Sequence, residues 1–166
     1  MAQTSKTNQE SGAGELTGGK FLTFQLKNEE YGLEILKVRE IIGVMNITTV
    51  PRTPDYVKGV INLRGKVVPV IDLRLKFDLQ GADYGRRTCI IVVNVNRLDM
   101  GIVVDTVSEV INIDSEQIEE TPSFGMNLNT DYILGMGKVG NEVKILLHID
   151  KVLSAEEVLE LHKMTG

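Results

Sequence analysis

The chain opens with a polar stretch and then changes abruptly to a pattern of alternating apolar and polar residues. Residues 1–19 are rich in Ser, Thr, Gln, Asn and Gly, with almost no bulky apolar side chain apart from Leu16. Ordering such a stretch costs conformational entropy that burial of so few apolar groups does not offset. We therefore predict a flexible N-terminal tail over residues 1–19.

Alternation beyond the tail predicts two β-hairpins. In the first, the segments 20–26 and 31–35 carry apolar side chains at alternate positions on either side of a polar turn. In the second, the apolar segments 60–63 and 67–71 flank Arg64-Gly65-Lys66. A glycine in so short a loop supplies the positive φ that a tight hairpin turn requires.

Three features in and between these hairpins are harder to assign. The segment 34–42 has apolar residues at helical spacing but a β-branched content that favours a strand, and in either case Glu40 is expected to point to solvent. Residues 53–59 predict a short helix, because Thr53 suits the N-cap and Pro54 the first turn. Pro69 has no backbone N–H to donate, so its strand is expected at an edge or a bulge.

The rest of the chain predicts further strands and one helix. From Ser154 the spacing to Glu157 is that of a capping box, and Val158, Leu159 and Leu161 supply an apolar stripe that should pack on the strands. Many short strands at this spacing indicate a barrel or a sandwich. The expected strands, rich in Ile and Val, are 88–96, 100–105, 107–113, 132–136 and 143–149.

Composition narrows the class of protein. The chain has 166 residues and a mass of 18.4 kDa, which suits one sizeable core, and its 42% hydrophobic and 25% charged residues are typical of a globular protein. One cysteine, Cys89, cannot form an internal disulfide, and with two histidines it does not complete a usual zinc ligand set. Neither a membrane-spanning apolar run nor a secretory signal is present, so we expect a cytoplasmic protein.

Charge is divided unevenly along the chain. The formal net charge of -5 argues against nonspecific nucleic-acid binding. Residues 51–97 nevertheless hold nine basic and four acidic side chains, whereas residues 98–166 hold four basic and 13 acidic ones. This polarity suggests different surfaces for different protein partners, although a solvated surface without function is the commoner explanation.

Two patterns raise the possibility of catalysis or nucleotide binding. Gly135–Gly140 has the glycine spacing of a dinucleotide-binding loop, but a strand rather than a helix is expected after it, so a hairpin turn is favoured. Asp72 and Asp105 each follow an apolar run and are candidates for acid–base groups in a small β-barrel hydrolase or isomerase. Aspartate is also common where strands give way to turns. A nucleic-acid-binding barrel is the rival among binding modules, but Tyr56 is the one aromatic residue near the basic loop.

A series of motifs, in order along the chain, resembles the CheW-like proteins of bacterial chemotaxis. The resemblance covers about residues 18–160, and the ordered combination is more specific than any one motif. The motifs are Glu30-Tyr31-Gly32-Leu33-Glu34-Ile35, Val38-Arg39-Glu40-Ile41, Gly59-Val60-Ile61-Asn62-Leu63-Arg64-Gly65, Val68-Pro69-Val70-Ile71-Asp72-Leu73-Arg74 and Gly101-Ile102-Val103-Val104-Asp105.

The resemblance implies an all-β fold with a short C-terminal helix, in which two five-stranded SH3-like β-barrels pack together. Residues 20–166 are then one CheW-like domain made of two barrel subdomains and the helix. The resemblance further implies no catalysis, cofactor or metal. It implies an adaptor that bridges the cytoplasmic tips of methyl-accepting chemoreceptors to the regulatory domain of the histidine kinase CheA, with no nucleic acid bound and no direct membrane insertion.

Site residues follow by motif from the same resemblance. The expected receptor-binding residues are Val38 and Glu40 in the Val-Arg-Glu-Ile segment, Arg64 in the Asn-Leu-Arg-Gly turn and Val110 in the Val-Ser-Glu-Val stretch. An arginine on a rigid hairpin tip can bind carboxylates or carbonyls of another protein. The alternative is a solvated surface arginine without a binding function. The expected kinase-binding residues are Tyr56, Lys58 and Phe124.

Overall fold

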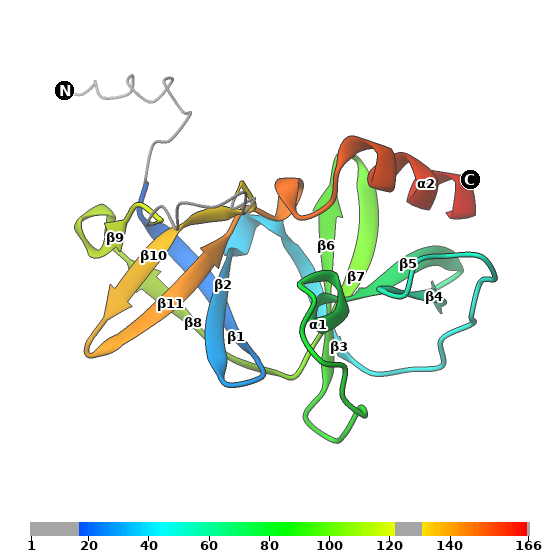
Figure 1. Ribbon diagram of the computed structural model, residues 1–166, viewed down its shortest axis with the longest axis horizontal. Coiled ribbons are helices and arrows are strands. Elements are labelled where there is room, and N and C mark those ends of the chain that lie inside the picture. The colour runs from blue at the N-terminus through cyan, green and yellow to red at the C-terminus, as the bar shows by residue number, and fades with distance from the viewer. Residues whose placement is uncertain (1–16, 122–130, 166) are drawn as a thin grey trace.

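The strands of the chain form two sheets that pack side by side (Figure 1). The computed structural model describes residues 17–121 and 131–165, and within these ranges one sheet has six strands in the order β8-β1-β2-β11-β10-β9 and the other has five in the order β3-β6-β7-β5-β4. The first sheet contains β1 (Gly19–Leu26), β2 (Glu29–Glu34), β8 (Thr106–Ile113), β9 (Ile118–Glu119), β10 (Ile133–Val139) and β11 (Glu142–Leu147). The second contains β3 (Val38–Gly43), β4 (Val57–Leu63), β5 (Lys66–Asp72), β6 (Cys89–Val95) and β7 (Leu98–Val104).

Helices are short: they lie at connections between strands or, in the case of α2, after the last strand. The α-helices are α1 (Leu73–Lys76) and α2 (Ala155–Thr165), and the 3-10 turns are η2 (Ile35–Lys37), η3 (Ser115–Gln117) and η4 (Ile149–Lys151). The predicted all-β fold with a short C-terminal helix is confirmed, and the first sheet has a sixth strand because the two-residue β9 pairs with β10. Among the described residues, no helix has the length and apolarity needed to span a membrane.

Each sheet curls until its two outer strands approach, so each sheet forms a barrel. In the second barrel, the chain beyond β3 reaches β4, where Thr48 and Val60 exchange two backbone hydrogen bonds of 2.8 and 2.9 Å. In the first barrel, η3 joins the outer strands β8 and β9, and the Gln117 amide donates to the Lys138 carbonyl oxygen of β10 at 3.2 Å. Closure removes strand edges that would otherwise pair with other chains.

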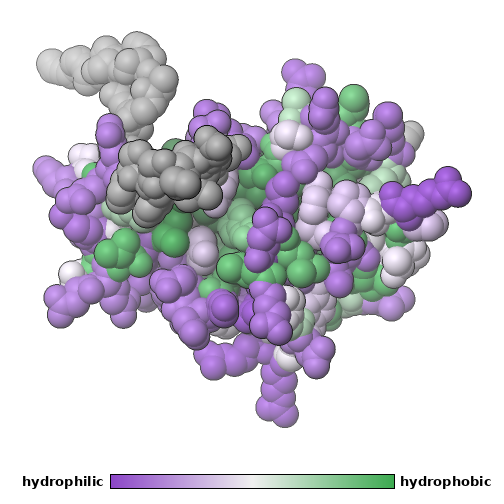
Figure 2. Space-filling model, in the orientation of Figure 1, coloured by the Kyte–Doolittle hydropathy of each residue, from purple (hydrophilic) through white to green (hydrophobic). Residues whose placement is uncertain are grey.

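A common core passes from one barrel into the other. Buried side chains of β1 and β2 pack in one cluster with side chains of β5, β6 and β7. Phe77, just after α1, inserts its ring between Tyr31 and Tyr132 of the first barrel, with ring centroids 6.0 and 5.0 Å away. Rings at such separations stabilise one another beyond the area that they bury. The two barrels therefore hold a fixed relative position. On the face shown in Figure 2, apolar residues gather over the middle of the molecule.

Both predicted hairpins are confirmed. β1 and β2 pair in antiparallel register, and β4 and β5 pair through the two-residue turn Arg64–Gly65. Gly135 and Gly137 lie within β10, and the turn to β11 follows at Gly140, so this glycine-rich segment is a hairpin. The capping box is also present, since the Ser154 amide and hydroxyl exchange hydrogen bonds with Glu157 at 2.8 and 3.1 Å.

Of three local predictions, two are wrong and one is met in part. Residues 53–59 do not form a helix: a single turn bond joins the Val57 amide to the Pro54 carbonyl, and β4 begins at once, because pairing with β5 uses the backbone that a helix would need. The strand with Pro69 is not at an edge, since β5 lies between β7 and β4, but the alternative of a bulge is met in the β4–β5 pair, whose register shifts between Val57 and Gly59. Leu159 is exposed and not part of the buried stripe of α2.

Two further predictions concern the segment 34–42 and the N-terminal tail 1–19. The ambiguous segment 34–42 divides into η2 and β3, so both readings were partly right. Residues 1–16 of the predicted tail lie outside the described residues, and Gly19, its last residue, already pairs with Ile113 of β8.

We predict that Gly59→Ala destabilises the fold strongly. Gly59 has φ 141°, and a Cβ there would lie 2.0 Å from the Thr48 carbonyl oxygen, which would force apart the pairing that closes the second barrel. The expected loss in the free energy of unfolding is about 2–4 kcal/mol, measured by denaturant titration. Gly43→Ala is the matched control, because no atom lies within 4 Å of its added Cβ. Equal stability of the two variants would contradict this account of closure.

Candidate functional site

The exposed end of the second barrel presents Arg64 on a rigid support. Arg64 and Gly65 form the turn between β4 and β5 with φ 53° and 87°, a pair of positive values typical of the tightest hairpins. The Asn62 side-chain oxygen accepts a hydrogen bond from the Gly65 amide at 2.7 Å, which fixes the turn. The Arg64 side chain is 71% exposed, so the backbone is held while the guanidinium remains accessible.

Arg64 forms an ion pair with Glu40 of β3, although β3 and the β4 strand that leads into the Arg64 turn are the opposite outer strands of the sheet. The Arg64 guanidinium donates a hydrogen bond to the Glu40 carboxylate, and this bond raises the pKa of Arg64. The expectation that Glu40 points to solvent is wrong, because strand alternation turns its side chain to the less exposed face of β3, where it is 29% exposed. A guanidinium has five N–H groups, so donors remain for a partner.

The two valines expected beside this pair lie on different barrels. Val38 begins β3, pairs with Val93 and is half-buried against the common core. Val110 lies on β8 of the first barrel opposite Leu22 and is 49% exposed. The structure thus brings Glu40 and Arg64 into contact, puts Val38 on the same strand as Glu40, and leaves Val110 as separate apolar surface.

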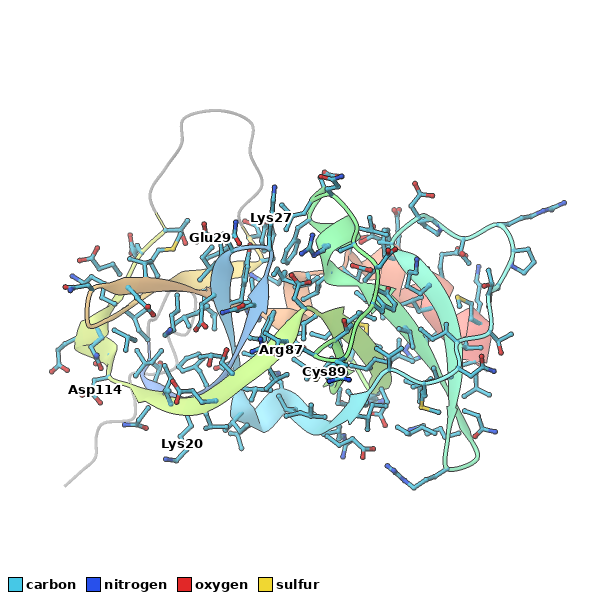
Figure 3. All side chains as sticks on the ribbon, turned by 90° about the horizontal axis from the view of Figure 1, so that it is seen from below. Lys20, Lys27, Glu29, Arg87, Cys89 and Asp114 are labelled. Atoms are coloured by element: carbon cyan, nitrogen blue, oxygen red, sulfur yellow. The ribbon has the colours of Figure 1, made fainter. Side chains whose placement is uncertain are left out.

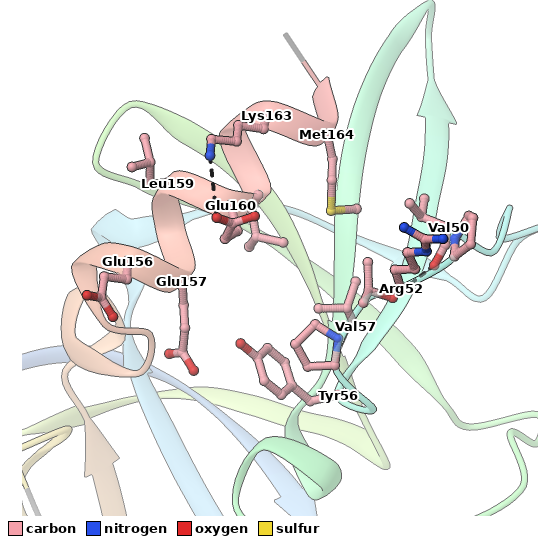
Figure 4. Close-up of a pocket in the computed structure, with 14 residues that line it drawn as sticks. Val50, Arg52, Tyr56, Val57, Glu156, Glu157, Leu159, Glu160, Lys163 and Met164 are labelled. Atoms are coloured by element: carbon pink, nitrogen blue, oxygen red, sulfur yellow. Dashed lines mark hydrogen bonds and ion pairs between the residues drawn. The ribbon is translucent and has the colours of Figure 1, made fainter.

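A groove of about 980 Å³ lies between α2 and the segment before β4 (Figure 4). Tyr56 is half-buried at its floor, and its ring points toward Glu157 of α2. The Lys76 ammonium lies 4.6 Å from the Tyr56 ring centroid and also donates to both Glu157 oxygens, at 2.9 and 3.0 Å. The lining residues are Val50, Pro51, Arg52, Thr53, Pro54, Tyr56, Val57, Glu156, Glu157, Leu159, Glu160, Leu161, Lys163 and Met164.

Electrostatics hold this groove in shape. Partial burial, with the Glu157 carboxylate nearby, raises the pKa of the Tyr56 hydroxyl. Burial alone would raise the pKa of Glu157, but hydrogen bonds from the Ser154 amide and Lys76 outweigh it and lower that pKa. Glu157 therefore stays charged and ties α1, α2 and Tyr56 together. The sequence predicted Tyr56 as a site residue but did not indicate that Lys76 and Leu159 lie near it, and the capping box at Glu157 was the one local signal for this side of the groove.

Of the other two expected kinase-binding residues, Lys58 and Phe124, the structure describes Lys58. Lys58 is half-buried on β4, with its ammonium 5.9 Å from the Tyr84 ring centroid. This separation is at the outer limit of a cation–π contact. Phe124 lies outside the described residues.

Both aspartates considered as acid–base groups have structural partners. The Asp72 carboxylate caps α1 through the Leu75 amide and accepts a hydrogen bond of 2.7 Å from the Tyr84 hydroxyl. Asp105, where the chain passes from β7 to β8, accepts from Arg74 at 2.8 Å. It also accepts from the Lys27 amide in the β1–β2 turn, at 2.8 Å. Asp105 thus joins the first barrel to α1 of the second.

The geometry defines a two-barrel β-protein with an exposed ion pair and a separate groove, and the comparisons agree with this class. Residues 20–157 match the CheW-like domain family, so the chain belongs to that family. It is similar to chemotaxis protein CheW of Klebsiella aerogenes, with 50% identity over 88% of each chain, and of Treponema pallidum, with 32% identity over 86% of each. A solved structure of scaffolding protein TtCheW from Thermoanaerobacter tengcongensis superposes with a TM-score of 0.75 and 34% identity, over 85% of this chain and 97% of that one.

Acid titration is predicted to weaken the joint at Asp105. Partial burial would raise the pKa of this carboxylate, but hydrogen bonds from Arg74 and the Lys27 amide hold it below the ordinary value of 3.8. A lowered pKa in the folded state contributes stability that is present above the ordinary pKa and lost as the pH falls through the folded value. Asp105→Asn should therefore cost about 1–3 kcal/mol of unfolding free energy at neutral pH and progressively less below about pH 4.

Denaturant titrations at pH 7 and pH 3 measure this difference. Asp55→Asn is the matched control, because Asp55 is exposed and the substitution makes the same change of charge. A cost for Asp105→Asn that is equal at both pH values would contradict the assigned role of the ion pair.

Proposed function

We propose that this protein is a non-catalytic adaptor that couples chemoreceptors to the histidine kinase CheA and lets receptors control autophosphorylation of the kinase. The observation that carries the proposal is Arg64, held on a rigid turn with its guanidinium exposed and oriented by Glu40. Membership of the CheW-like family supports it, as do the relatives named chemotaxis protein CheW and scaffolding protein TtCheW. Asp72 and Asp105 both serve as structural acceptors, so nothing favours an acid–base role for either.

The proposed receptor-binding surface consists of Val38, Glu40, Arg64 and Val110. A receptor tip is a helical hairpin, and a helix docks by placing its apolar stripe on a partner's apolar surface. The exposed part of Val110 and the half-buried Val38 offer such surface. Arg64 then sets the register of the helix, because a charged hydrogen bond demands a particular geometry whereas apolar contact does not.

The proposed kinase-binding surface is the groove beside α2 with Tyr56 at its floor, together with Lys58 on the adjoining β4 and Phe124 as a further contact in ring assembly. The groove combines apolar lining with the exposed side chain of Leu159. The regulatory domain of CheA is the proposed occupant. Because this groove and the Arg64 surface are built from different residues, one adaptor can hold receptor and kinase together.

Two separate contacts explain how a protein without catalysis controls a kinase. Joint binding raises the effective concentration of receptor and kinase for each other. If the receptor states differ in their affinity for the adaptor, the kinase experiences that difference as well. The proposal places the protein in the cytoplasm at membrane receptor arrays, without membrane insertion, nucleic acid or cofactor. It treats residues 20–166 as one CheW-like domain of two barrel subdomains.

Arg64→Asp should abolish most receptor association while leaving the fold intact. Asp tolerates the positive φ at this turn, and the side chain is exposed, so the denaturant midpoint should change little. The affinity for a purified receptor-tip fragment, measured by titration calorimetry, should fall at least about tenfold. Arg64→Asn, which also tolerates the turn, should give a smaller loss. An unchanged affinity in a folded Arg64→Asp variant would reject the proposed receptor surface.

Leu159→Lys tests the kinase surface independently. Leu159 is 56% exposed, so the substitution should not disturb folding, but a charge placed on the groove should weaken binding of the CheA regulatory domain at least about fivefold. Binding of the receptor fragment should remain at the wild-type value. Leu36→Lys is the control, because Leu36 is 95% exposed and lies outside the groove. Equal kinase affinity of the two variants would count against this groove as the contact.

A further inference from the structure

A second basic feature adjoins Arg64 at the same end of the second barrel. It is a hollow of about 410 Å³ bounded by the β4–β5 turn, the β6–β7 turn and the last turn of α2. Gly65 contributes to its wall, so the hollow borders the turn that carries Arg64. The remaining lining residues are Lys66, Val67, Arg97, Leu98, Asp99, His162 and Thr165.

Strand register explains why the two turns meet. β5 and β7 run parallel, with Val70 opposite Gly101, so both strands start at the same end of the barrel. The β6–β7 turn consists of Asn96 and Arg97, with φ 51° and 67°. It is therefore the same tight type of turn as the one at Arg64, and both turns hold their basic side chains on rigid supports.

Positive charge exceeds negative charge around the hollow. The Asp99 carboxylate is shared by Lys66, whose ammonium lies 2.9 Å away, and by Arg39, whose Nε lies 3.5 Å away. Burial would raise the pKa of Asp99, but a hydrogen bond from Asn94 and the contact with Lys66 lower it, so the carboxylate stays charged. Arg97 is exposed and forms no ion pair within residues 17–121 and 131–165.

The local balance is thus four basic side chains against two carboxylates. Arg39 and Lys66 both form ion pairs with Asp99, and Arg64 forms one with Glu40. Arg97 has no ion-pair partner in the described part of the chain. An exposed cationic surface of this kind recognises the opposite charge and steers its approach. The excess of basic residues between positions 51 and 97 accounts for part of this surface.

We propose that this hollow binds an acidic side chain, a glutamate or aspartate, on the receptor helix that docks beside Arg64. The guanidinium of Arg97 supplies two parallel N–H donors that match a carboxylate, and Lys66 adds a second positive charge. Val67, which is 45% exposed, offers apolar surface to the methylene groups of a glutamate. The inference rests on the proposed receptor-binding function and adds to it a second anchor with a stated partner chemistry.

Salt dependence separates this anchor from apolar docking. Charges exposed at a surface interact weakly at high ionic strength, because counterions screen them over about 10 Å at 0.1 M salt and about 3 Å at 1 M. Receptor affinity should therefore fall with added salt, and part of that fall should belong to Arg97. The contribution of Val110 and Val38 should depend little on salt.

The test compares Arg97→Asn with Arg87→Asn. Asn tolerates the positive φ at position 97, so folding should be retained, and an unchanged thermal midpoint checks this. Arg87 is an exposed arginine just before β6, at the end of that strand opposite to the β6–β7 turn (Figure 3). Binding of the receptor-tip fragment is measured in about 0.05 M and about 0.5 M salt. Arg97→Asn should bind about three- to tenfold more weakly in low salt and within about twofold of wild type in high salt.

Arg87→Asn should match the wild type at both salt concentrations, and Arg97→Lys should retain most of the affinity in low salt because it keeps the charge. If Arg97→Asn binds the receptor fragment like wild type in low salt while Arg64→Asp does not, the hollow is not an anchor and the adaptor function stands. A loss of kinase binding instead of receptor binding would overturn the assignment of the occupant. If wild type binds no receptor fragment, both the proposed function and this inference fail.

Discussion

Closure of the second barrel is the constraint on which the exposed features of this protein depend. The sheet order leaves β3 and β4 as outer strands, and two backbone hydrogen bonds between Thr48 and Val60 join them. The joint requires glycine at position 59, since any side chain there would meet the Thr48 backbone. Because the barrel is closed, Glu40 on one outer strand can orient Arg64 beside the other. Backbone pairing thus determines where the proposed receptor contact lies.

The common core gives the two barrels a fixed relative position, which an adaptor needs if contacts on separate faces are to act together. The Phe77 ring packs between Tyr31 and Tyr132, and the Arg74–Asp105 pair ties α1 to the crossover between the barrels. Lys76, on the same short helix, holds Glu157 and Tyr56 at the groove. α1 therefore contacts the crossover and α2, and Phe77 directly after it contacts the first barrel, so this short segment connects the main parts of the fold.

Much of the fold was predictable because alternation of apolar and polar residues is a local signal. It located the hairpins around residues 27 and 64, and the capping box located the start of α2. Prediction failed where contacts between residues distant in the sequence determine the local structure or the exposure of a side chain. Thr53 has the residue type of an N-cap, but the strand pairing of β4 with β5 prevents a helix there. The exposure of Glu40 depends on its ion pair with Arg64, which is 24 residues away in the sequence. The Arg64 turn was predictable from Asn-Leu-Arg-Gly, whereas the groove depends on α2 lying against the segment before β4, which no local pattern indicates.

The central claim is that this protein transmits receptor state to a kinase without chemistry of its own. The most direct measurement is the rate of CheA autophosphorylation in a mixture of purified kinase, receptor fragments and this protein, with and without receptor ligand. The account predicts that the rate depends on receptor and ligand only when the protein is present, and that Arg64→Asp removes this dependence. A rate that responds to receptor equally well without the protein, or that stays constant when all three components are present, would contradict it.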